Sequence, residues 1–404
     1  SHNFQYLIKK TVFLMETNQD NNTYMQPSEI RQVLLIALIA MLRMFGLFSL
    51  LPVISIYASN LDGATPILIG LSVGAYGLTQ ALLQIPFGFF SDKIGRKPVI
   101  FFGLIIFIFG SLISFYSETI IGLILGRLLQ GAGAISATLS ALLSDVTRDS
   151  VRTKSMAILG VGIGASFLLS LMLGPIISSH FGVRSLFIIA VFMSTLSIFI
   201  LVAMPNVKRL NYHPPLDIGE LVKRPILLCN INIFFLHLVL TVIFVIFPFM
   251  MISEFNVSTE NQWKFYMSSL IVSLIFSGPL IMNDDRKKKK MSLIYPIVSL
   301  LFSQVILITG EDSSLLLFSS LLVFFISFNY LEATLPSRIS IFSKKEIKGA
   351  TLGVFSSCQF LGAFFGGLIG GILIGLFEPS QAHLLLTIII FVWFFIMFAF
   401  RRDL

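Results

Sequence analysis

The sequence predicts an all-α membrane protein with twelve transmembrane helices in two halves of six. Of the 404 residues, 56% are hydrophobic and only 12% are charged, whereas a soluble domain carries about 25% charged residues. Apolar runs of about 20 residues, the length that crosses a bilayer as a helix, follow one another along the chain. One polar linker divides these runs six and six. A water-soluble core could not bury so much apolar surface, so lipid must be the solvent.

The chain order of the elements follows from these runs. Residues 1–30 are polar and mixed, and we expect a largely disordered cytoplasmic extension without a signal peptide. The linker at 205–224 is charged and contains two adjacent prolines, so the halves cover 31–204 and 225–404. The twelve runs, each expected to form one helix, lie at 32–58, 66–90, 98–116, 119–144, 155–178, 184–204, 225–252, 264–283, 291–309, 313–335, 349–377 and 381–400.

The distribution of Lys and Arg predicts the orientation. With the N-terminus in the cytoplasm, 24 of the 28 Lys and Arg residues fall in inside segments. Only Arg184 and Lys264 fall outside, and Arg43 and Arg127 lie within spans. The positive-inside rule therefore places both termini in the cytoplasm. The net charge of +8 is then a topology and lipid-surface signal. A nucleic-acid partner is not expected, because no concentrated basic patch or known module is present. We expect a monomer.

A short polar loop separates the second and third runs. It reads Gly-Phe-Phe-Ser-Asp-Lys-Ile-Gly-Arg-Lys over 88–97. This resembles the signature of the major facilitator superfamily between its second and third helices. The resemblance implies alternating access, with Asp92 contacting the cytoplasmic end of the eleventh helix and with Gly88, Gly95 and Arg96 completing a conformational switch. Its basic residues would also meet anionic lipid headgroups. The alternative is a basic loop that only fixes topology.

Three ionisable residues inside spans are candidates for proton coupling. Arg127 belongs to Leu-Gly-Arg-Leu-Leu-Gln-Gly-Ala-Gly, which resembles the fourth-helix signature of proton-coupled members and implies a role in coupling. The alternative is an arginine bonded to backbone carbonyls at a helix crossing. His237 has a reference pKa of about 6.5, which suits proton transfer, but it could equally be a satisfied interior histidine. Glu332 is the only carboxylate within a span, and its alternative role is to pair with Arg338.

Polar side chains within the spans outline a substrate cavity. A charge in the membrane costs about 2.5–3.5 kcal/mol on the insertion scale, so each requires a reason. Arg43, near the middle of the first run, is either an anchor for a substrate charge or a second structural arginine. Tyr76, Gln80 and Gln84 are four residues apart and share one helix face. The full candidate set is Arg43, Tyr76, Gln80, Gln84, Gln130, Asn232, Asn329 and Gln359.

Several further segments resemble the YajR-type transporters of bacterial inner membranes. They lie at 41–52, 76–80, 84–88, 141–145, 328–333, 335–337 and 357–362. The likeness covers nearly the whole chain and implies a multi-pass protein of the bacterial inner membrane. Some members of that type carry a small soluble domain after the twelfth helix, and we expect this domain to be absent.

The resemblance implies a secondary active transporter that moves a small solute across the inner membrane and is driven by protons. We expect export by antiport. Gly174-Pro175 in the fifth run resembles part of the signature of drug/proton antiporters, although Ile176, Ile177, Ser178 and Ser179 replace the glycines that should follow. The alternatives are a proton-coupled importer of a polar or anionic metabolite and a transport-silent membrane sensor or scaffold.

The sequence gives no indication of an enzyme. It contains no phosphate-binding loop, no metal-ligand spacing and no nucleophile elbow. Cys229 and Cys358 both lie in apolar runs and are expected to be buried small hydrophobic residues, with no metal and no disulfide. We therefore expect no cofactor, with a proton gradient as the energy source and a small molecule and membrane lipid as partners.

Overall fold

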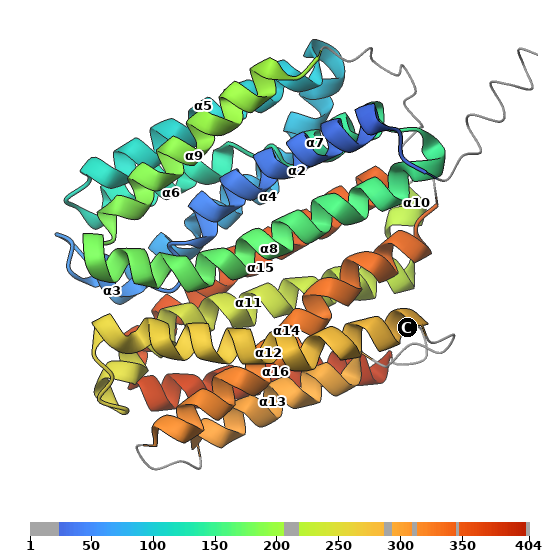
Figure 1. Ribbon diagram of the computed structural model, residues 1–404. Helices are drawn as coiled ribbons and strands as arrows, with labels where there is room; N and C mark the ends of the chain where they lie inside the picture. The colour runs from blue at the N-terminus through green and yellow to red at the C-terminus, as the bar shows by residue number, and fades with distance from the viewer. Residues whose placement is uncertain (1–23, 206–217, 287–292, 309–312, 345–346, 401–404) are drawn as a thin grey trace, which may run out of the picture.

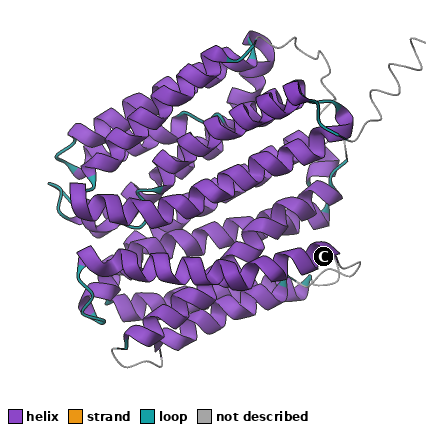
Figure 2. Ribbon diagram, in the orientation of Figure 1, coloured by secondary structure: helices purple, strands orange, loops and turns teal. Residues whose placement is uncertain are grey.

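The structure is a computed structural model that describes residues 24–205, 218–286, 293–308, 313–344 and 347–400. Residues 1–23 of the extension expected at 1–30, and most of the linker, lie outside these ranges. The last residues of that extension belong to the first helix, which begins at Pro27. The described chain is helical throughout, apart from turns and one isolated bridge between Asp62 and Thr119 (Figure 2). Eleven helical stretches of the described chain are long and apolar enough to cross a membrane, if the interrupted stretch Ile120–Asp145 is taken as one, and Ile294–Leu307 is a shorter apolar helix. This agrees with the twelve spans expected.

The first half is built from eight helical segments. They are α2 (Pro27–Phe48), α3 (Ile54–Ser59), α4 (Pro66–Ile94), α5 (Arg96–Tyr116), α6 (Ile120–Ala132), α7 (Ser136–Asp145), α8 (Asp149–Phe181) and α9 (Arg184–Ala203). The fourth run, expected as one helix, is interrupted after Ala132. Glycine favours such a break because it lowers helix propensity by about 1 kcal/mol. Gly133 also packs against the carbonyl of Gly103, where a Cβ would overlap. The first run is likewise divided, with α2 ending before Pro52.

The second half follows a short linker helix. Its elements are α10 (Ile218–Leu221), α11 (Arg224–Ser253), the 3-10 turn η1 (Thr259–Asn261), α12 (Gln262–Arg286), α13 (Ile294–Ile308), α14 (Ser314–Phe342), α15 (Lys348–Leu376) and α16 (Pro379–Ala399). In Figure 1 the helices of the two halves form an upper and a lower bundle. The start of α2, α10 and the end of α16 share one end of the molecule, called here the terminal end.

Two helices, α4 and α15, form the main contact between the halves. Glycines let their backbones touch: a Cβ at Gly70 would overlap the carbonyl of Gly367, and one at Gly74 would lie 2.8 Å from the carbonyl of Ala363. Close approach through small residues is the usual way in which helices gain van der Waals contact in lipid. The contact continues toward the terminal end, where the Ser357 hydroxyl donates to the carbonyl of Ala81 at 3.3 Å.

Other small residues serve packing within one half. The glycines at 362, 366 and 370 face α11, and a Cβ at any of them would meet atoms of Phe234, Leu238 or Val245 within 3 Å. The glycine rows of the eleventh run therefore divide between two neighbours. One row meets α4 across the boundary between the halves, and the other meets α11 inside the second half.

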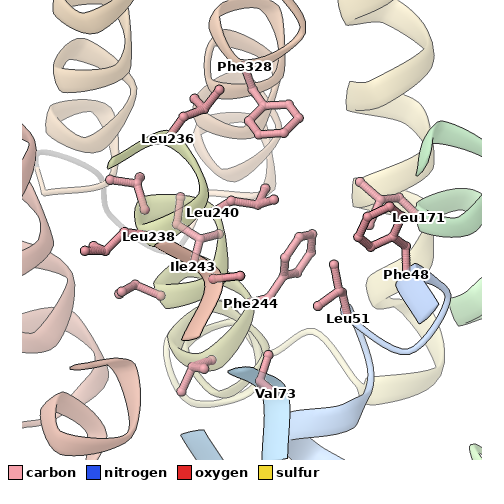
Figure 3. Close-up of a cluster of buried hydrophobic side chains, with 14 of the residues drawn as sticks. Phe48, Leu51, Val73, Leu171, Leu236, Leu238, Leu240, Ile243, Phe244 and Phe328 are labelled. Carbon is pink, nitrogen blue, oxygen red and sulfur yellow. The ribbon is translucent and has the colours of Figure 1, made fainter. Parts of the chain in front are cut away.

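A second seam between the halves is apolar. Phe48 and Leu171 of the first half lie opposite Phe244 and Phe328 of the second in one continuous core cluster (Figure 3). The hydroxyl of Ser55 donates to the carbonyl of Phe244 at 3.1 Å. This seam fills the space between the halves with side chains, so any solute passing there would have to separate them.

Candidate functional site

The second half brings three of the expected residues together. His237 from α11, Glu332 from α14 and Gln359 from α15 form a triangle of polar contacts. His237 Nε2 lies 3.0 Å from Glu332 Oε2, Gln359 Nε2 lies 2.8 Å from His237 Nε2, and Gln359 Nε2 lies 3.0 Å from Glu332 Oε1. His237 is 5% exposed, whereas the Glu332 side chain is 30% exposed. The imidazole is therefore buried, whereas the carboxylate and the Gln359 amide belong to partly exposed residues.

Aromatic rings connect this triangle to the first half. The His237 ring lies 5.9 Å, edge to face, from Phe328, and Phe328 stacks on Phe167 of α8 at 5.4 Å. Phe167 in turn meets Phe48 of α2 at 5.2 Å. Such contacts contribute about 0.5–1.5 kcal/mol beyond their buried area. His237 is thus connected through two ring contacts to the apolar seam between the halves, so a displacement of His237 would alter the packing of Phe328 on Phe167.

The three contacts of the triangle cannot all be hydrogen bonds at once. With Nε2 of His237 unprotonated, the Gln359 amide can donate one hydrogen to His237 and one to Glu332. With Nε2 protonated, the imidazole can donate to Glu332, but the contact between His237 and Gln359 then joins two donors. A proton on Nε2 therefore exchanges a bond from α11 to α15 for a bond from α11 to α14. The arrangement is chemically able to convert proton binding into a change of helix contacts.

Arg127 in the first half makes the contacts of a structural residue. It is fully buried. Nε donates to the carbonyl of Ser72 at 3.2 Å, Nη2 to that of Val73 at 3.4 Å and Nη1 to Gln130 Oε1 at 2.7 Å. The guanidinium also lies 4.6 Å from the centre of the Tyr76 ring. These contacts tie α6 to α4, as the alternative interpretation from the sequence expects.

Arg43 is equally buried but has fewer partners. Nη2 donates to Gln80 Oε1 at 2.9 Å, and Nη1 reaches the sulfur of Met44 at 3.8 Å. Its guanidinium lies 5.4 Å from the centre of the Phe107 ring. Nε has no hydrogen-bond partner among the described residues. Gln80 continues the chain of contacts, because its Nε2 lies 3.5 Å from Ser136 Oγ.

The remaining cavity candidates divide into two groups. Tyr76 and Gln84 lie on the boundary between the halves: the Tyr76 ring meets Phe360 at 6.3 Å, and Gln84 Nε2 lies 3.5 Å from the carbonyl of Gly353. Each member of the other group is hydrogen-bonded to a residue of its own half. The structure does not bring these members together in one cavity. In this group Asn232 accepts from Trp393, Asn329 donates to Ser273, and Gln130 donates to Ser111.

The loop between α4 and α5 is a turn braced by charges. Gly95 has φ 109°, a conformation that favours glycine. Arg96 pairs with Asp92, and its Nε lies 3.0 Å from Asp145 Oδ2 at the end of α7. Gly88 accepts a hydrogen bond from Ser91 at 2.6 Å. A Cβ added at Gly88 would meet only ordinary van der Waals contact, with Ala137 at 3.9 Å, so packing does not require a glycine there.

Asp92, Arg96 and Asp145 form what we call the loop cluster. Asp145 is the member of this cluster to which the sequence analysis assigned no role. It stands at the end of the fourth run, after Ala141-Leu-Leu-Ser, and only its place beside a loop rich in cations could have pointed to it. The expected contact between Asp92 and the start of the eleventh helix involves residues 345–346 and the Lys348 side chain, which lie outside the described residues. That contact stays a prediction.

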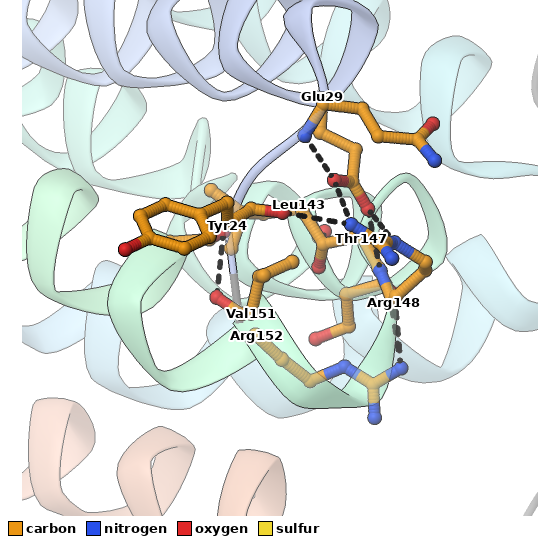
Figure 4. A network of polar contacts seen from close by, with 10 residues as sticks. Tyr24, Glu29, Leu143, Thr147, Arg148, Val151 and Arg152 are labelled. Atoms are coloured by element: carbon orange, nitrogen blue, oxygen red, sulfur yellow. Dashed lines mark hydrogen bonds and ion pairs between the residues drawn. The ribbon is translucent and has the colours of Figure 1, made fainter. Parts of the chain in front are cut away.

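A further polar network secures the terminal end of the first half (Figure 4). The carboxylate of Glu29 accepts from Arg148, with Nε to Oε1 at 3.0 Å and Nη2 to Oε2 at 3.1 Å. Arg148 also donates from Nη2 to the carbonyl of Tyr24 at 3.0 Å. A bidentate pair of this kind fixes geometry as well as adding energy. It ties the start of α2 to the start of α8.

No group of three or more His, Cys, Asp or Glu side chains within the described ranges is placed to hold a metal ion. Cys229 is buried and Cys358 is partly buried, and both are free thiols.

Comparisons with known proteins agree with the architecture. Residues 36–366 match the family model of the Major Facilitator Superfamily. The chain is 37% identical over 381 residues to the inner membrane transport protein YajR of Escherichia coli, covering 92% of this chain and 84% of that protein. It is 37% identical over 328 residues to the uncharacterized transporter BU466 of Buchnera aphidicola, covering 78% of this chain and 83% of that one. The crystal structure of a D-xylose-proton symporter superposes with a TM-score of 0.74 at 15% identity, covering 92% of this chain and 97% of that chain.

Proposed function

The chain belongs to the major facilitator superfamily, and from this premise we propose that it is a proton-coupled secondary active transporter whose proton-binding site is His237, Glu332 and Gln359. Its many apolar helices make it a multi-pass membrane protein. The positive-inside distribution of Lys and Arg supports an inner-membrane orientation with both termini in the cytoplasm.

The single observation that carries this proposal is the triangle of contacts. A carboxylate and an imidazole in the membrane are costly and are functional by default. Here they lie 3.0 Å apart on two different helices, with an amide from a third helix within 3.0 Å of both. An imidazole can bind and release a proton, and the partly exposed carboxylate offers a route by which protons can arrive.

The coupling step follows from which helix each group belongs to. Gln359 stands on α15, the same helix that packs against α4 of the other half through Gly70 and Gly367. When His237 takes a proton at Nε2, the bond from Gln359 to His237 is lost, and α15 is freer to shift against α4. Proton binding then biases the contact between the halves, which is the two-state element that alternating access requires.

Arg127 serves this mechanism as a positioning residue. An arginine stays protonated in proteins and so does not release a proton itself. Its bonds to the carbonyls of Ser72 and Val73 hold α4 in place. It therefore sets the surface against which α15 moves.

Export by proton antiport is the direction that we propose. The Gly174-Pro175 pair supports it. It resembles part of the antiporter signature and lies at a close helix crossing, where a Cβ at Gly174 would overlap the carbonyl of Ser49. Uptake of an anionic metabolite is the second candidate. The observation that favours it is the buried Arg43, which has no acidic partner among the described residues.

Proton flux in proteoliposomes tests this function. The purified protein is reconstituted with an interior pH dye, a pH gradient is imposed, and pools of metabolites and cationic dyes are added. Substrate-dependent proton flux that is lost in Glu332→Gln is the expected result, and its sign distinguishes export from uptake. Glu254→Gln at the far end of α11 is the matched control and should leave flux unchanged. Flux that persists at the wild-type rate in Glu332→Gln would contradict the proposed proton site.

A further inference from the structure

Arg43 is a buried cation whose hydrogen-bonding capacity is mostly unused. Its side chain is 1% exposed. A guanidinium carries five N–H donors, yet among the described residues Gln80 alone supplies it with an oxygen acceptor. The sulfur of Met44 is a weak acceptor, and Nε is buried without a partner. The residue therefore has donors available for another group.

Burial alone does not explain why Arg43 has so few hydrogen-bond partners, because Arg127 is also buried and has more of them. That guanidinium is buried to the same degree, and it meets three oxygens: two backbone carbonyls and the amide of Gln130. The fold thus supplies one buried arginine with three oxygen acceptors from its own chain. It leaves the other with one oxygen. Since an uncompensated buried charge is strongly destabilising, a group that completes Arg43 would be favoured.

A small space lies beside Arg43. Arg43 lines a cavity of about 10 Å³ with Ser136 of α7, and aliphatic side chains of α2, α7 and α8 form the rest of the wall. This volume holds about one water-sized sphere, such as a monatomic ion or one carboxylate oxygen. The Ser136 hydroxyl can donate into it. The polar lining is a guanidinium and a hydroxyl, with no carboxylate, so the chemistry selects an anion.

We propose that Arg43 and Ser136 form an anion subsite that takes one chloride-sized anion or one carboxylate group of the transported solute. A water molecule would accept a hydrogen bond from the guanidinium but would leave its charge uncompensated. An anion would accept the hydrogen bonds and also neutralise the charge. In the carboxylate form the inference rests on the proposed transport function and names the substrate class as organic anions. In the chloride form the anion is a resident counter-ion of the first half.

Anion-dependent thermal unfolding of the full chain in nanodiscs tests this subsite. The protein is placed in a buffer whose only anion is gluconate, and chloride or acetate is titrated in at constant ionic strength. We expect a saturable rise in the unfolding midpoint. Arg43→Gln should weaken the apparent affinity about tenfold or more, because hydrogen bonds to a charged group are lost. Ser136→Thr, which adds a methyl group to the cavity wall and keeps Arg43, should weaken it as well.

The outcomes separate the two sources of the anion and the two proposals. A shift with acetate as well as chloride supports the solute carboxylate, and a shift with chloride alone supports a resident halide. The subsite is overturned if the wild-type protein gives no saturable shift, or if Arg43→Gln and Ser136→Thr both give the wild-type shift with the wild-type affinity. If Arg43→Gln does not fold, Ser136→Thr decides alone. Glu332→Gln should bind the anion normally, so failure of the proton site and failure of this subsite are distinguishable.

Discussion

The two halves of the molecule hold different ionisable groups within their spans. The first half holds two arginines deep in its spans, fixed by backbone carbonyls, amides and aromatic rings, and no carboxylate pairs with them in the described chain. The second half holds a carboxylate and an imidazole in direct contact. A guanidinium is a permanent charge, whereas a carboxylate–imidazole pair can gain and lose protons. In the proposed mechanism, therefore, the first half supplies permanent positive charge and the second half supplies the proton-binding site.

The largest expected effect comes from the second half. Glu332→Gln keeps the shape of the side chain but removes its proton chemistry, and we expect coupled transport to fall about 100-fold or more, the usual contribution of a positioned acid–base group. Counterflow of solute without a pH gradient should survive, because it needs no net proton movement. Measuring both modes in the same proteoliposomes checks this. If both fell equally, the carboxylate would serve binding or folding instead of coupling.

The two arginines should respond differently to the same substitution. Arg127→Gln leaves Gln130 and the α4 carbonyls without their charged donor, and we expect a loss of about 2 kcal/mol or more in stability. Arg43→Gln loses one bond to Gln80 and removes an incompletely paired charge, so we expect a smaller loss. Thermal unfolding of both variants in gluconate measures the difference. Equal losses would remove the distinction between a structural and a ligand-binding arginine.

The glycine contact between the halves offers a smaller but selective test. Gly70→Ala introduces a Cβ against the carbonyl of Gly367, and we expect transport to slow about tenfold while the protein still folds. Gly164→Ala is the matched control, since nothing lies within 4 Å of a Cβ there. Alanine at that helical position should stabilise slightly. Transport rate and unfolding midpoint are measured for both. Equal behaviour of the two variants would argue against movement along α4 and α15.

The smallest effect concerns the linker. Lys223, and then Lys344 at the end of α14, hydrogen-bond the Glu220 carboxylate and hold its pKa below the ordinary value of 4.5. A lowered carboxyl pKa adds stability at pH values above the ordinary pKa, and this is lost as pH falls through the lowered one. We expect α10 to stay docked at neutral pH and to loosen only in acid, below the ordinary carboxyl pKa of 4.5. Spin labels at 221 and 341 measure the distance. In Glu220→Gln it should no longer depend on pH, and a wild-type transition near neutrality would contradict the assignment.

Sequence patterns predicted the spans well because twenty apolar residues have few alternatives in lipid. They did not predict the breaks at Pro52 in the first run and at Gly133 in the fourth run, each of which divides one expected helix into two segments. Tertiary contact with Gly103 cannot be read from local composition. His237, Glu332 and Gln359 were expected separately as rare polar residues in spans. Their meeting depends on how α11, α14 and α15 pack.

Two further features of the candidate site could not be foreseen. Asn232 and Asn329, like Gln359, are amide side chains within apolar spans. Asn232, however, bonds with Trp393 of α16, and Asn329 bonds with Ser273 of α12. Only the rotation of each helix about its axis decides between these roles. Asp145 was missed because it lies 49 positions from Arg96, its partner in the loop cluster.

Infrared difference spectroscopy of the protein in nanodiscs tests the proton site most directly, because it needs no knowledge of the solute. During a pH titration, the account predicts a carboxylate band that shifts when His237 takes a proton at Nε2 beside Glu332. This band should be absent in Glu332→Gln and unchanged in Glu254→Gln. Gln359→Leu should shift that band, since the amide that donates to the carboxylate is gone. A spectrum in which no carboxyl band depends on Glu332 would contradict the assignment of the proton site to the second half.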